Sequence, residues 1–301
     1  MFQACAEDTK GQTCFICTQA LHWNTKEGLV RGCACRGTAG FAHVSCLAEQ
    51  AKILVTEAEE NNLGLKVINA RMGRWQTCGL CKQWYHGVVK CALGWACWKT
   101  YLGRPETDKL RRPAIGLLGN GLHAAHHCED ALSVREAELS TERRLGDSEG
   151  RILIVKGNIA NSYQRLGRTE ALNMYRDVYF GWLKFGGELD SRTLSAACNY
   201  AGMLKILKQF EETKALLRKT LAAARRALGE THSVRLTLTW TYAQVLYDNP
   251  GATLDDLNEA VTTLTDAARI AHRVLGGAHP RAVAIADSLR RALAALRGRT
   301  E

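Results

Sequence analysis

The spacing of the cysteines constrains this 301-residue chain more than any other feature. Seven of its twelve cysteines and one histidine form four close pairs, with one or two residues between the members of each: Cys14 with Cys17, Cys33 with Cys35, His43 with Cys46, and Cys78 with Cys81. A pair at such spacing lets one tight turn direct two ligands to the same tetrahedral ion. Four pairs therefore predict two closed zinc sites. Because the metals would replace much of a hydrophobic core in so short a segment, we expect residues 14–81 to be unfolded without zinc.

The five remaining cysteines do not extend this pattern. Cys91, Cys97 and Cys198 lie in apolar helical stretches, which favours a place in the core. A cluster of His123, His126, His127 and Cys128 is the one rival for a third metal site, and its glycine-rich helical surroundings argue against it. Apart from this weak cluster, none of the five has the Cys/His neighbours that a nucleophilic thiol needs. No phosphate-binding G-x-x-x-x-G-K loop occurs, so nucleotide chemistry is also unsupported.

In chain order the eight ligands read C4HC3, with one residue inside the second pair and seven residues between that pair and His43. Over residues 12–86 this pattern closely resembles the RING-CH (RING-variant) finger. A PHD finger has the same ligand order, but typically a wider second pair and an aromatic residue two positions before the seventh ligand, where this chain has Gln76. We favour the RING-CH interpretation, and a PHD-like reader of histone tails is the weaker alternative.

The resemblance implies two interleaved Zn²⁺ sites, one on Cys14, Cys17, His43 and Cys46 and the other on Cys33, Cys35, Cys78 and Cys81. Closed sites of this kind hold shape and do not activate water. The resemblance further implies a ubiquitin ligase, which positions a ubiquitin-conjugating enzyme carrying ubiquitin and forms no covalent intermediate. Ile16, directly before the second ligand, and Lys82, directly after the last, match contacts that RING fingers make with this enzyme. A role for Ile16 in a local core, and for Lys82 as an ordinary exposed lysine, stays open.

Two positions depart from the RING-CH pattern. Gln50 replaces the tryptophan often found four residues after the sixth ligand, and Gly79 replaces the proline common after the seventh. Both changes weaken the apolar platform that a conjugating enzyme would contact. A non-catalytic zinc-binding adaptor or scaffold is therefore the alternative to a ligase.

Between the third and fourth pairs, the stretch 47–54 and the glutamates after it predict a helix that ends near Asn61. Leu65, Val67 and Ile68 then alternate with polar residues, which predicts a short strand leading to Trp75. Residues 84–102 predict an amphipathic helix. We therefore expect a finger at 12–86, a connecting segment at 87–113 and a helical region at 114–297.

The helical region contains a repeat. No proline occurs between Pro113 and Pro250, and apolar residues recur three and four positions apart. Related endings begin at Leu145, Phe185, Leu228 and Leu275, at intervals of 40, 43 and 47 residues, and each places a glycine just after a helix. Two helices fit between consecutive endings, for example at 152–165 and 169–185.

Helix pairs of this length with a Leu-Gly-x-x-His-Pro ending resemble the tetratricopeptide repeats of kinesin light chains. The resemblance implies a superhelix whose inner face binds a protein or peptide substrate. Asn158 and Asn199, 41 residues apart on successive inner helices, are candidates for gripping that partner, and capping or bridging of neighbouring helices is the alternative. The expected fold is thus a small zinc-stapled α+β cross-brace finger followed by an all-α tetratricopeptide-like repeat superhelix.

Charge and hydropathy restrict the partners and the location. The formal net charge of +10 falls to +7 with seven metal-bound thiolates and two divalent ions. Basic pairs such as Arg143 and Arg144 lie among acidic residues, so we expect solvated helix faces and no nucleic-acid surface. No stretch of about 20 apolar residues could span a membrane, and the first residues do not resemble a secretory leader. We expect a soluble intracellular protein, in the cytoplasm or the nucleus.

Overall fold

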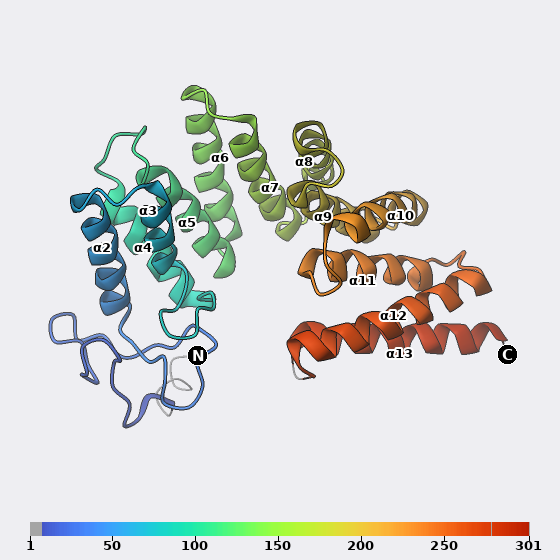
Figure 1. Cartoon of the computed structure of the whole chain (residues 1–301), viewed down its shortest axis with the longest axis horizontal. Coiled ribbons are helices and arrows are strands. Elements are labelled where there is room, and N and C mark those ends of the chain that lie inside the picture. The colour runs from blue at the N-terminus through green and yellow to red at the C-terminus, as the bar shows by residue number, and fades with distance from the viewer. Residues whose placement is uncertain (1–7, 278, 301) are drawn as a thin grey trace. The chain divides into compact units, whose positions relative to one another are not determined.

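The structure is a computed structural model that describes residues 8–277 and 279–300. The chain divides into two compact units, the first ending at Ser148 and the second beginning at Glu149. Within the described residues all regular elements are helices (Figure 1). None of these helices is long and apolar enough to cross a lipid bilayer.

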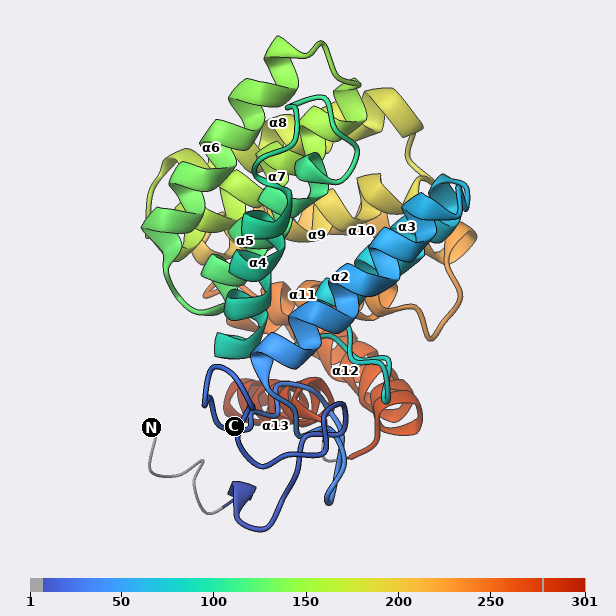
Figure 2. The ribbon, with the colours of Figure 1, turned by 90° about the vertical axis from the view of Figure 1, so that its left-hand side faces the viewer.

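The first unit begins with metal-binding loops and continues as helices. The first loops extend to residue 43 and lie at the amino-terminal end of α2 (Figure 2), and a further loop at 76–86 carries the fourth ligand pair. Two isolated antiparallel bridges, Val30 with Ala42 and Thr77 with Trp84, are their only β pairing among the described residues. The helices are α2 (Val44–Glu60), α3 (Leu65–Met72), the short 3-10 helix η1 (Gly73–Trp75), α4 (Gly87–Tyr101), α5 (Arg111–Ala124) and α6 (Cys128–Arg144).

Helix α2 confirms the helix predicted from residue 47 onward. Its buried side chains include Leu47, Ala51, Val55 and Ala58, which recur every three or four residues and so form one apolar face. The Glu27 carboxylate accepts a hydrogen bond of 2.7 Å from the backbone N–H of Ser45, which ties the preceding loop to the first turn of α2. The helix ends at Glu60 with Asn61 as its C-cap, which confirms the end predicted near Asn61.

The strand predicted at residues 65–68 is wrong, because these residues form helix α3. Leu65 and Val67 are exposed, while Ile68 is half-buried and Met72 is buried. Ile68 and Met72 lie four positions apart, on one face of a helix, and both pack into a cluster with Ala51 and Val55 of α2. Burial at helical spacing therefore overrides the short alternation in the sequence.

Helix α4 packs against both α2 and α5. Val89, Leu93, Cys97 and Tyr101 recur every four residues and are buried. The packing of α4 against α5 depends on glycines at the interface. A Cβ added at Gly94 would lie 2.8 Å from the carbonyl oxygen of Leu117, and one at Gly121 would lie 2.9 Å from the Cα of Cys91. The two helices thus approach more closely than larger residues would permit.

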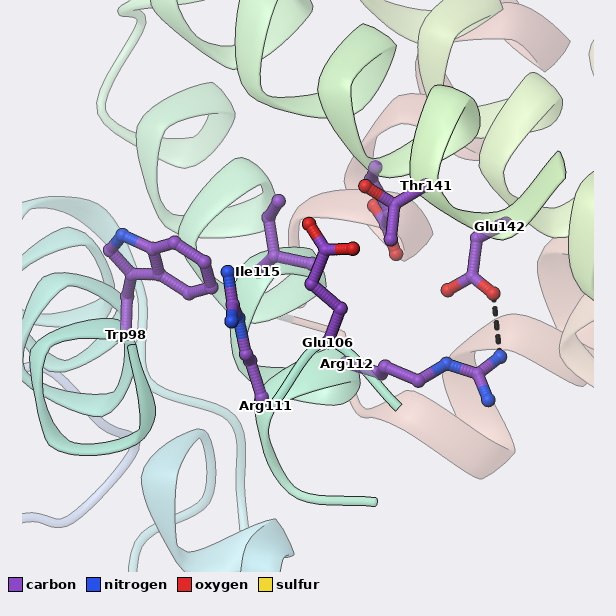
Figure 3. A pocket seen from close by; sticks show the side chains of 8 residues that line it. Trp98, Glu106, Arg111, Arg112, Ile115, Thr141 and Glu142 are labelled. Atoms are coloured by element: carbon purple, nitrogen blue, oxygen red, sulfur yellow. Dashed lines mark hydrogen bonds and ion pairs between the residues drawn. The ribbon is translucent and has the colours of Figure 1, made fainter. Parts of the chain in front are cut away.

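Helices α5 and α6 pack against each other, and charged residues lie at their interface. Arg112 donates a hydrogen bond of 2.6 Å to the buried carboxylate of Glu142 (Figure 3). Arg112 also pairs with Asp147. Trp98 and Arg111 line the hollow beside this pair. Its volume is about 30 Å³, which suits a single water molecule and not a substrate.

The second unit consists of α7 (Glu149–Arg165), α8 (Glu170–Gly186), α9 (Ser191–Ile206), α10 (Phe210–Ala227), α11 (Ser233–Asp248), α12 (Leu254–Leu275) and α13 (Pro280–Thr300). The helices predicted at 152–165 and 169–185 are confirmed as α7 and α8. In the later repeats the first helix of each pair also contacts the first helix of the next, α9 with α11 and α11 with α13. These first helices therefore form the inner layer of the stack.

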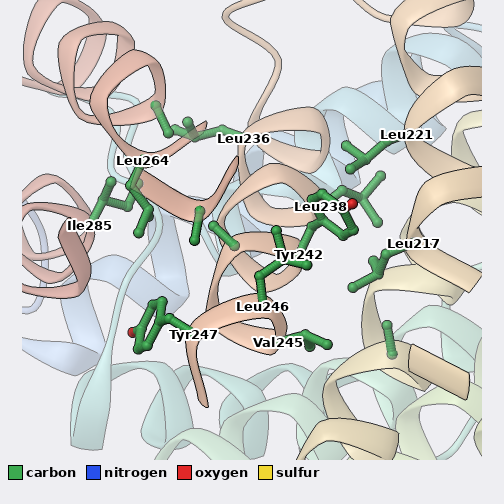
Figure 4. Packing of buried hydrophobic residues seen from close by; sticks show 14 of the residues in the cluster. Leu217, Leu221, Leu236, Leu238, Tyr242, Val245, Leu246, Tyr247, Leu264 and Ile285 are labelled. Atoms are coloured by element: carbon green, nitrogen blue, oxygen red, sulfur yellow. The ribbon is translucent and has the colours of Figure 1, made fainter. Parts of the chain in front are cut away.

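A continuous core connects the later repeats. Leu217 and Leu221 of α10, Leu238 and Leu246 of α11, and Ile285 of α13 belong to one cluster of buried residues (Figure 4). Buried positions lie on several sides of α11, because this helix is packed between the pairs before and after it.

The repeat endings differ from the prediction in one place. Gly146, Gly187 and Gly276 have positive φ angles and end their helices in the predicted way. Gly229 is not among the residues with positive φ, and α10 instead ends through an extended Leu228. Residue 278 of the last ending lies outside the described residues.

The side chain that follows each later ending caps the next inner helix. Asp190, His232 and His279 accept hydrogen bonds of 2.7, 3.3 and 3.1 Å from the backbone N–H two residues further on. The histidine of the Leu-Gly-x-x-His ending is thus an N-cap.

Candidate metal centre

The first predicted ligand group comes together at the start of α2. Cys14, Cys17, His43 and Cys46 place their ligand atoms within 4.8 Å of one another, and Cys14 and His43 are fully buried. Nδ1 of His43 lies 3.3 Å from Sγ of Cys17 and 3.5 Å from Sγ of Cys46. Ligands bound at about 2.3 Å to one zinc lie roughly 3.8 Å apart, so these separations fit a tetrahedral ion. The other ring nitrogen, Nε2, lies 3.3 Å from the carbonyl oxygen of Ala20, which orients the imidazole.

The second group comes together at the other end of the finger loops. Cys33, Cys35, Cys78 and Cys81 also place their sulfurs within 4.8 Å of one another, and the sulfurs of Cys35 and Cys78 are 3.8 Å apart. Gly40 lies against this group with a φ of 86°, and a Cβ there would lie 3.2 Å from the sulfur of Cys33. The first and third pairs thus share one site and the second and fourth share the other, which is a cross-brace.

The two C-x2-C turns have the same backbone geometry. In the first, the N–H of Thr18 donates to the carbonyl of Cys14, and the N–H of Ile16 points at the Cys14 sulfur at 3.4 Å. In the second, the N–H of Lys82 donates to the carbonyl of Cys78, and the N–H of Leu80 points at the Cys78 sulfur at 3.4 Å. Such N–H groups stabilise a thiolate, so each turn is built for a negatively charged sulfur.

The electrostatics of both groups call for a cation. Burial raises the pKa of Cys33 and of Cys46, and the neighbouring sulfurs raise both further. Burial is the largest single influence on Cys81 and raises its pKa, but the hydrogen bonds from the backbone of Gln83 and from Cys35 and Cys78 together outweigh it and bring the pKa to about 7. A divalent ion removes the repulsion between the thiolates. The donor sets, S₃N and S₄, are soft and tetrahedral and fit two structural Zn²⁺ ions.

The predicted contact residue Ile16 lines a groove beside the first metal site. The groove has a volume of about 390 Å³ and is lined by Ile16, His22, Trp23, Ser45, Cys46, Glu49, Gln50, Ile53 and Leu54. Ile16 is half-buried, whereas Trp23 is 70% exposed and Ile53 is 47% exposed. Trp23 and Ile53 were not predicted from the sequence. The available signal was a lone tryptophan in a polar loop between two ligand pairs.

The other residues singled out in the finger meet at Gly79. The Nζ of Lys82 donates a hydrogen bond of 2.5 Å to the carbonyl of Gly79. The guanidinium of Arg74 lies against the same glycine, in space that a Cβ at residue 79 would occupy, so a larger residue there would shift the guanidinium. Arg74 also donates a hydrogen bond of 2.9 Å to Oε1 of Gln50. The two departures from the RING-CH pattern, Gln50 and Gly79, are therefore joined by Arg74.

The remaining candidates lie elsewhere. Asn158 is half-buried on α7 and Asn199 is exposed on α9. The cluster at residues 123–128 does not gather its side chains, since the two finger groups are the only sets of three or more potential metal ligands found in the described part of the chain.

Three cysteines outside the finger lie in the core, as predicted. Cys97 is fully buried, Cys91 packs beside Leu118 and Leu122, and burial raises the pKa of Cys198 to about 12. Cys5 lies outside the described residues.

Comparisons with known proteins agree with the division into a zinc finger and helical repeats. Residues 14–62 match the RING-variant domain, and residues 193–233 match a tetratricopeptide repeat. A search of curated protein sequences returned no match. Among solved structures, a protein of Podosopora anserina with kinesin-light-chain TPR-like repeats is 21% identical, with a TM-score of 0.54, over 63% of this chain and 88% of that one. BtubC from P. vanneervenii is 15% identical, with a TM-score of 0.49, over 85% of this chain and 89% of that one.

The chain therefore combines an amino-terminal RING-variant domain, with Cys/His groups for two zinc ions, and a stacked array of tetratricopeptide repeats whose fold is that of kinesin-light-chain-like repeat proteins.

Proposed function

We propose that this protein is a RING-type ubiquitin ligase. The finger would dock a ubiquitin-conjugating enzyme that carries ubiquitin, and the repeats would bind the substrate or another protein partner. The observation that carries this proposal is the groove beside the first metal site, in which Ile16 lies together with the exposed side chains of Trp23 and Ile53. The indole of Trp23 is 70% exposed and borders the groove. Hydration of so much apolar surface is unfavourable, and burial against a protein partner would remove this cost.

The expected chemistry is positioning. Both ligand groups are closed, so neither zinc would offer a coordination position to water or substrate. The finger would hold the thioester of the conjugating enzyme in a geometry that favours attack by a substrate lysine. Lys82 lies directly after the last ligand and is exposed, which suits its proposed contact with the conjugating enzyme and ubiquitin.

The repeats suit a partner with negative charge. The inner helices α7, α9, α11 and α13 carry three, two, one and five Arg or Lys residues, against one, none, one and one Asp or Glu. The outer helices α8, α10 and α12 carry two, five and two basic residues against two, two and four acidic residues, so only their totals of nine and eight are nearly equal. We infer that the inner layer, with Asn158 and Asn199 as candidate contacts, binds an extended or helical protein segment.

The alternative is a zinc-binding adaptor without ligase activity. It is favoured by Gln50 and Gly79, which replace apolar groups of the RING-CH platform. We also propose the domain boundaries expected from the sequence, with a finger at 12–86, a connecting segment at 87–113 and repeats at 114–297. The reduced thiols that the metal groups need favour a location inside the cell.

A self-ubiquitination assay tests the proposal. We expect the zinc-loaded full chain to form ubiquitin chains with at least one member of a broad panel of conjugating enzymes. Trp23→Ala and Ile16→Ala should lower the rate about tenfold or more, because each removes an apolar contact from the groove. Trp95→Ala is the matched control, since Trp95 is an exposed tryptophan on α4 outside the groove. If no enzyme of the panel supports chain formation while two zinc ions are bound, the ligase proposal fails and the adaptor remains.

A further inference from the structure

We propose that Arg74 determines which conjugating enzyme the finger accepts, by binding a carboxylate of an Asp or Glu side chain on that enzyme. The inference rests on the proposed function and adds to it the chemistry of the partner. An apolar platform is typical of RING fingers, whereas this chain places a guanidinium between Gln50 and Gly79.

Arg74 differs from neighbouring half-buried arginines because it has no acidic partner. Arg71 of α3 pairs with Glu57 at 3.2 Å, and Arg104 pairs with Glu59 at 2.7 Å. Arg74 forms no ion pair with any residue that the structure describes, and its one hydrogen bond goes to the neutral amide of Gln50. The guanidinium lies beside the thiolates of the second metal group but has no carboxylate partner among the described residues, so an acidic side chain of a partner can pair with it.

The guanidinium is held in place for such a contact. Nη2 donates to Gln50, Nε is enclosed, and the plane of the group covers Gly79, which has no side chain to displace it. Nη1 has no hydrogen-bond partner among the described residues and remains available. A planar guanidinium fixed by one nitrogen and open at another suits recognition of a carboxylate.

The location of Arg74 connects it to the groove. Gln50, its hydrogen-bond partner, lines the groove together with Ile16 and Trp23. Lys82 reaches the carbonyl of Gly79, so a second cation lies on the same glycine. Glu49 is the one carboxylate that lines the groove, and it pairs with Lys52 at 3.5 Å. A partner that docks its apolar residues against Trp23 would thus meet, at Arg74, a guanidinium that has no carboxylate partner among the described residues.

Calorimetric titration of the zinc-loaded full chain with purified conjugating enzymes tests this inference. For the enzyme that binds best, Arg74→Gln should raise Kd about tenfold or more, as expected when one partner of a desolvated charge pair is lost. The loss should shrink as NaCl rises from about 0.05 to about 0.5 M, because salt screens the wild-type pair. Lys66→Gln is the matched control, since Lys66 is an exposed cation on α3, and its Kd should change less than about twofold.

Two further variants keep the test decisive if Arg74→Gln loosens the finger. Gln50→Glu supplies the missing counter-ion within the chain, so the finger should keep two zinc ions while its affinity falls. Arg74→Glu should regain affinity when one Asp or Glu on the docking face of the enzyme is changed to Lys. If no conjugating enzyme binds the wild type, the proposed function fails together with this inference. If the wild type binds but Arg74→Gln and Gln50→Glu bind equally well, or no charge exchange restores affinity, only this inference is overturned.

Discussion

At the scale of single residues, the same thiol group has opposite chemistry in different parts of the chain. Burial raises the pKa of Cys97 and of Cys198, which keeps these thiols neutral and inert. In the finger the thiols differ from one another, since the pKa of Cys81 falls to about 7 while burial and neighbouring sulfurs raise the pKa of Cys33 and Cys46. Grouping into sets of four ligand atoms, and not the pKa of a single thiol, therefore separates the metal ligands from the structural cysteines.

This contrast predicts the result of matched Cys→Ser substitutions. Cys46→Ser should lower the bound zinc from two ions per chain to about one, because serine replaces one of four ligands with a weak donor. Cys91→Ser removes a half-buried thiol outside both groups and should leave two ions bound. Mass spectrometry under native conditions measures the metal content directly. Equal zinc loss in both variants would contradict the assignment of ligands.

The sequence predicts ligand residues better than it predicts what surrounds them. Local spacing identifies the four ligand pairs, because each pair is a single turn of chain. The contacts of Arg74 could not be predicted from the sequence, because its partners Gln50 and Gly79 lie on either side of it in the chain and come together only in the folded finger. The groove could not be predicted either, because it forms between the loop that carries Trp23 and the face of α2 that carries Ile53.

At the scale of elements, long periodic segments were predictable and short ones were not. Helices α7 and α8 extend over many turns, so their period is clear in the sequence. Residues 65–68 offer only one turn, and alternation over four residues fits a helix as well as a strand. The better signal is Ile68 followed four residues later by Met72, both of which pack onto α2.

The cap of α9 gives a prediction that depends on pH. Hydrogen bonds from Arg192 lower the pKa of Asp190 to about 2, below its value of about 3.9 in an unfolded chain. A lowered pKa means that the stabilisation is complete above about pH 4 and disappears as the pH falls toward 2. Asp190→Ala should therefore lower the free energy of unfolding of the repeats by about 1 kcal/mol at pH 7. The difference from the wild type should shrink at pH 3.

Denaturant unfolding followed by circular dichroism at both pH values measures this difference. Asp177→Ala is the control, because Asp177 is an exposed aspartate inside α8 and caps no helix. The cap explanation would be wrong if the two variants lost equal stability at pH 7, or if the Asp190→Ala difference persisted unchanged below pH 3.

At the scale of the whole molecule, the finger loops and the second unit owe their stability to different sources. Most helices of the second unit bury apolar side chains against the next pair, and one cluster extends from α9 to α13. Such an array is stabilised by contacts between neighbouring repeats. The finger loops have few buried side chains apart from the ligands themselves, such as Leu29 and Phe41. Metal binding must therefore supply much of the folding free energy of the finger.

Removal of zinc from the full chain should separate these two sources of stability. With a strong chelator, we expect backbone amides of residues 14–86 to lose protection from hydrogen exchange, because α2 loses the ligands His43 and Cys46 that anchor its first turn. Helix α4 should also loosen, since Val89 and Leu93 pack into the same cluster as the ligands. Amides of α9–α13 should keep their protection within about twofold, because their core contains no ligand. Mass spectrometry of the exchanged peptides measures each region, and restored protection on return of Zn²⁺ is the control. Loss of protection throughout the repeats would show that the metals stabilise the whole chain and that the stability of the repeats depends on the finger.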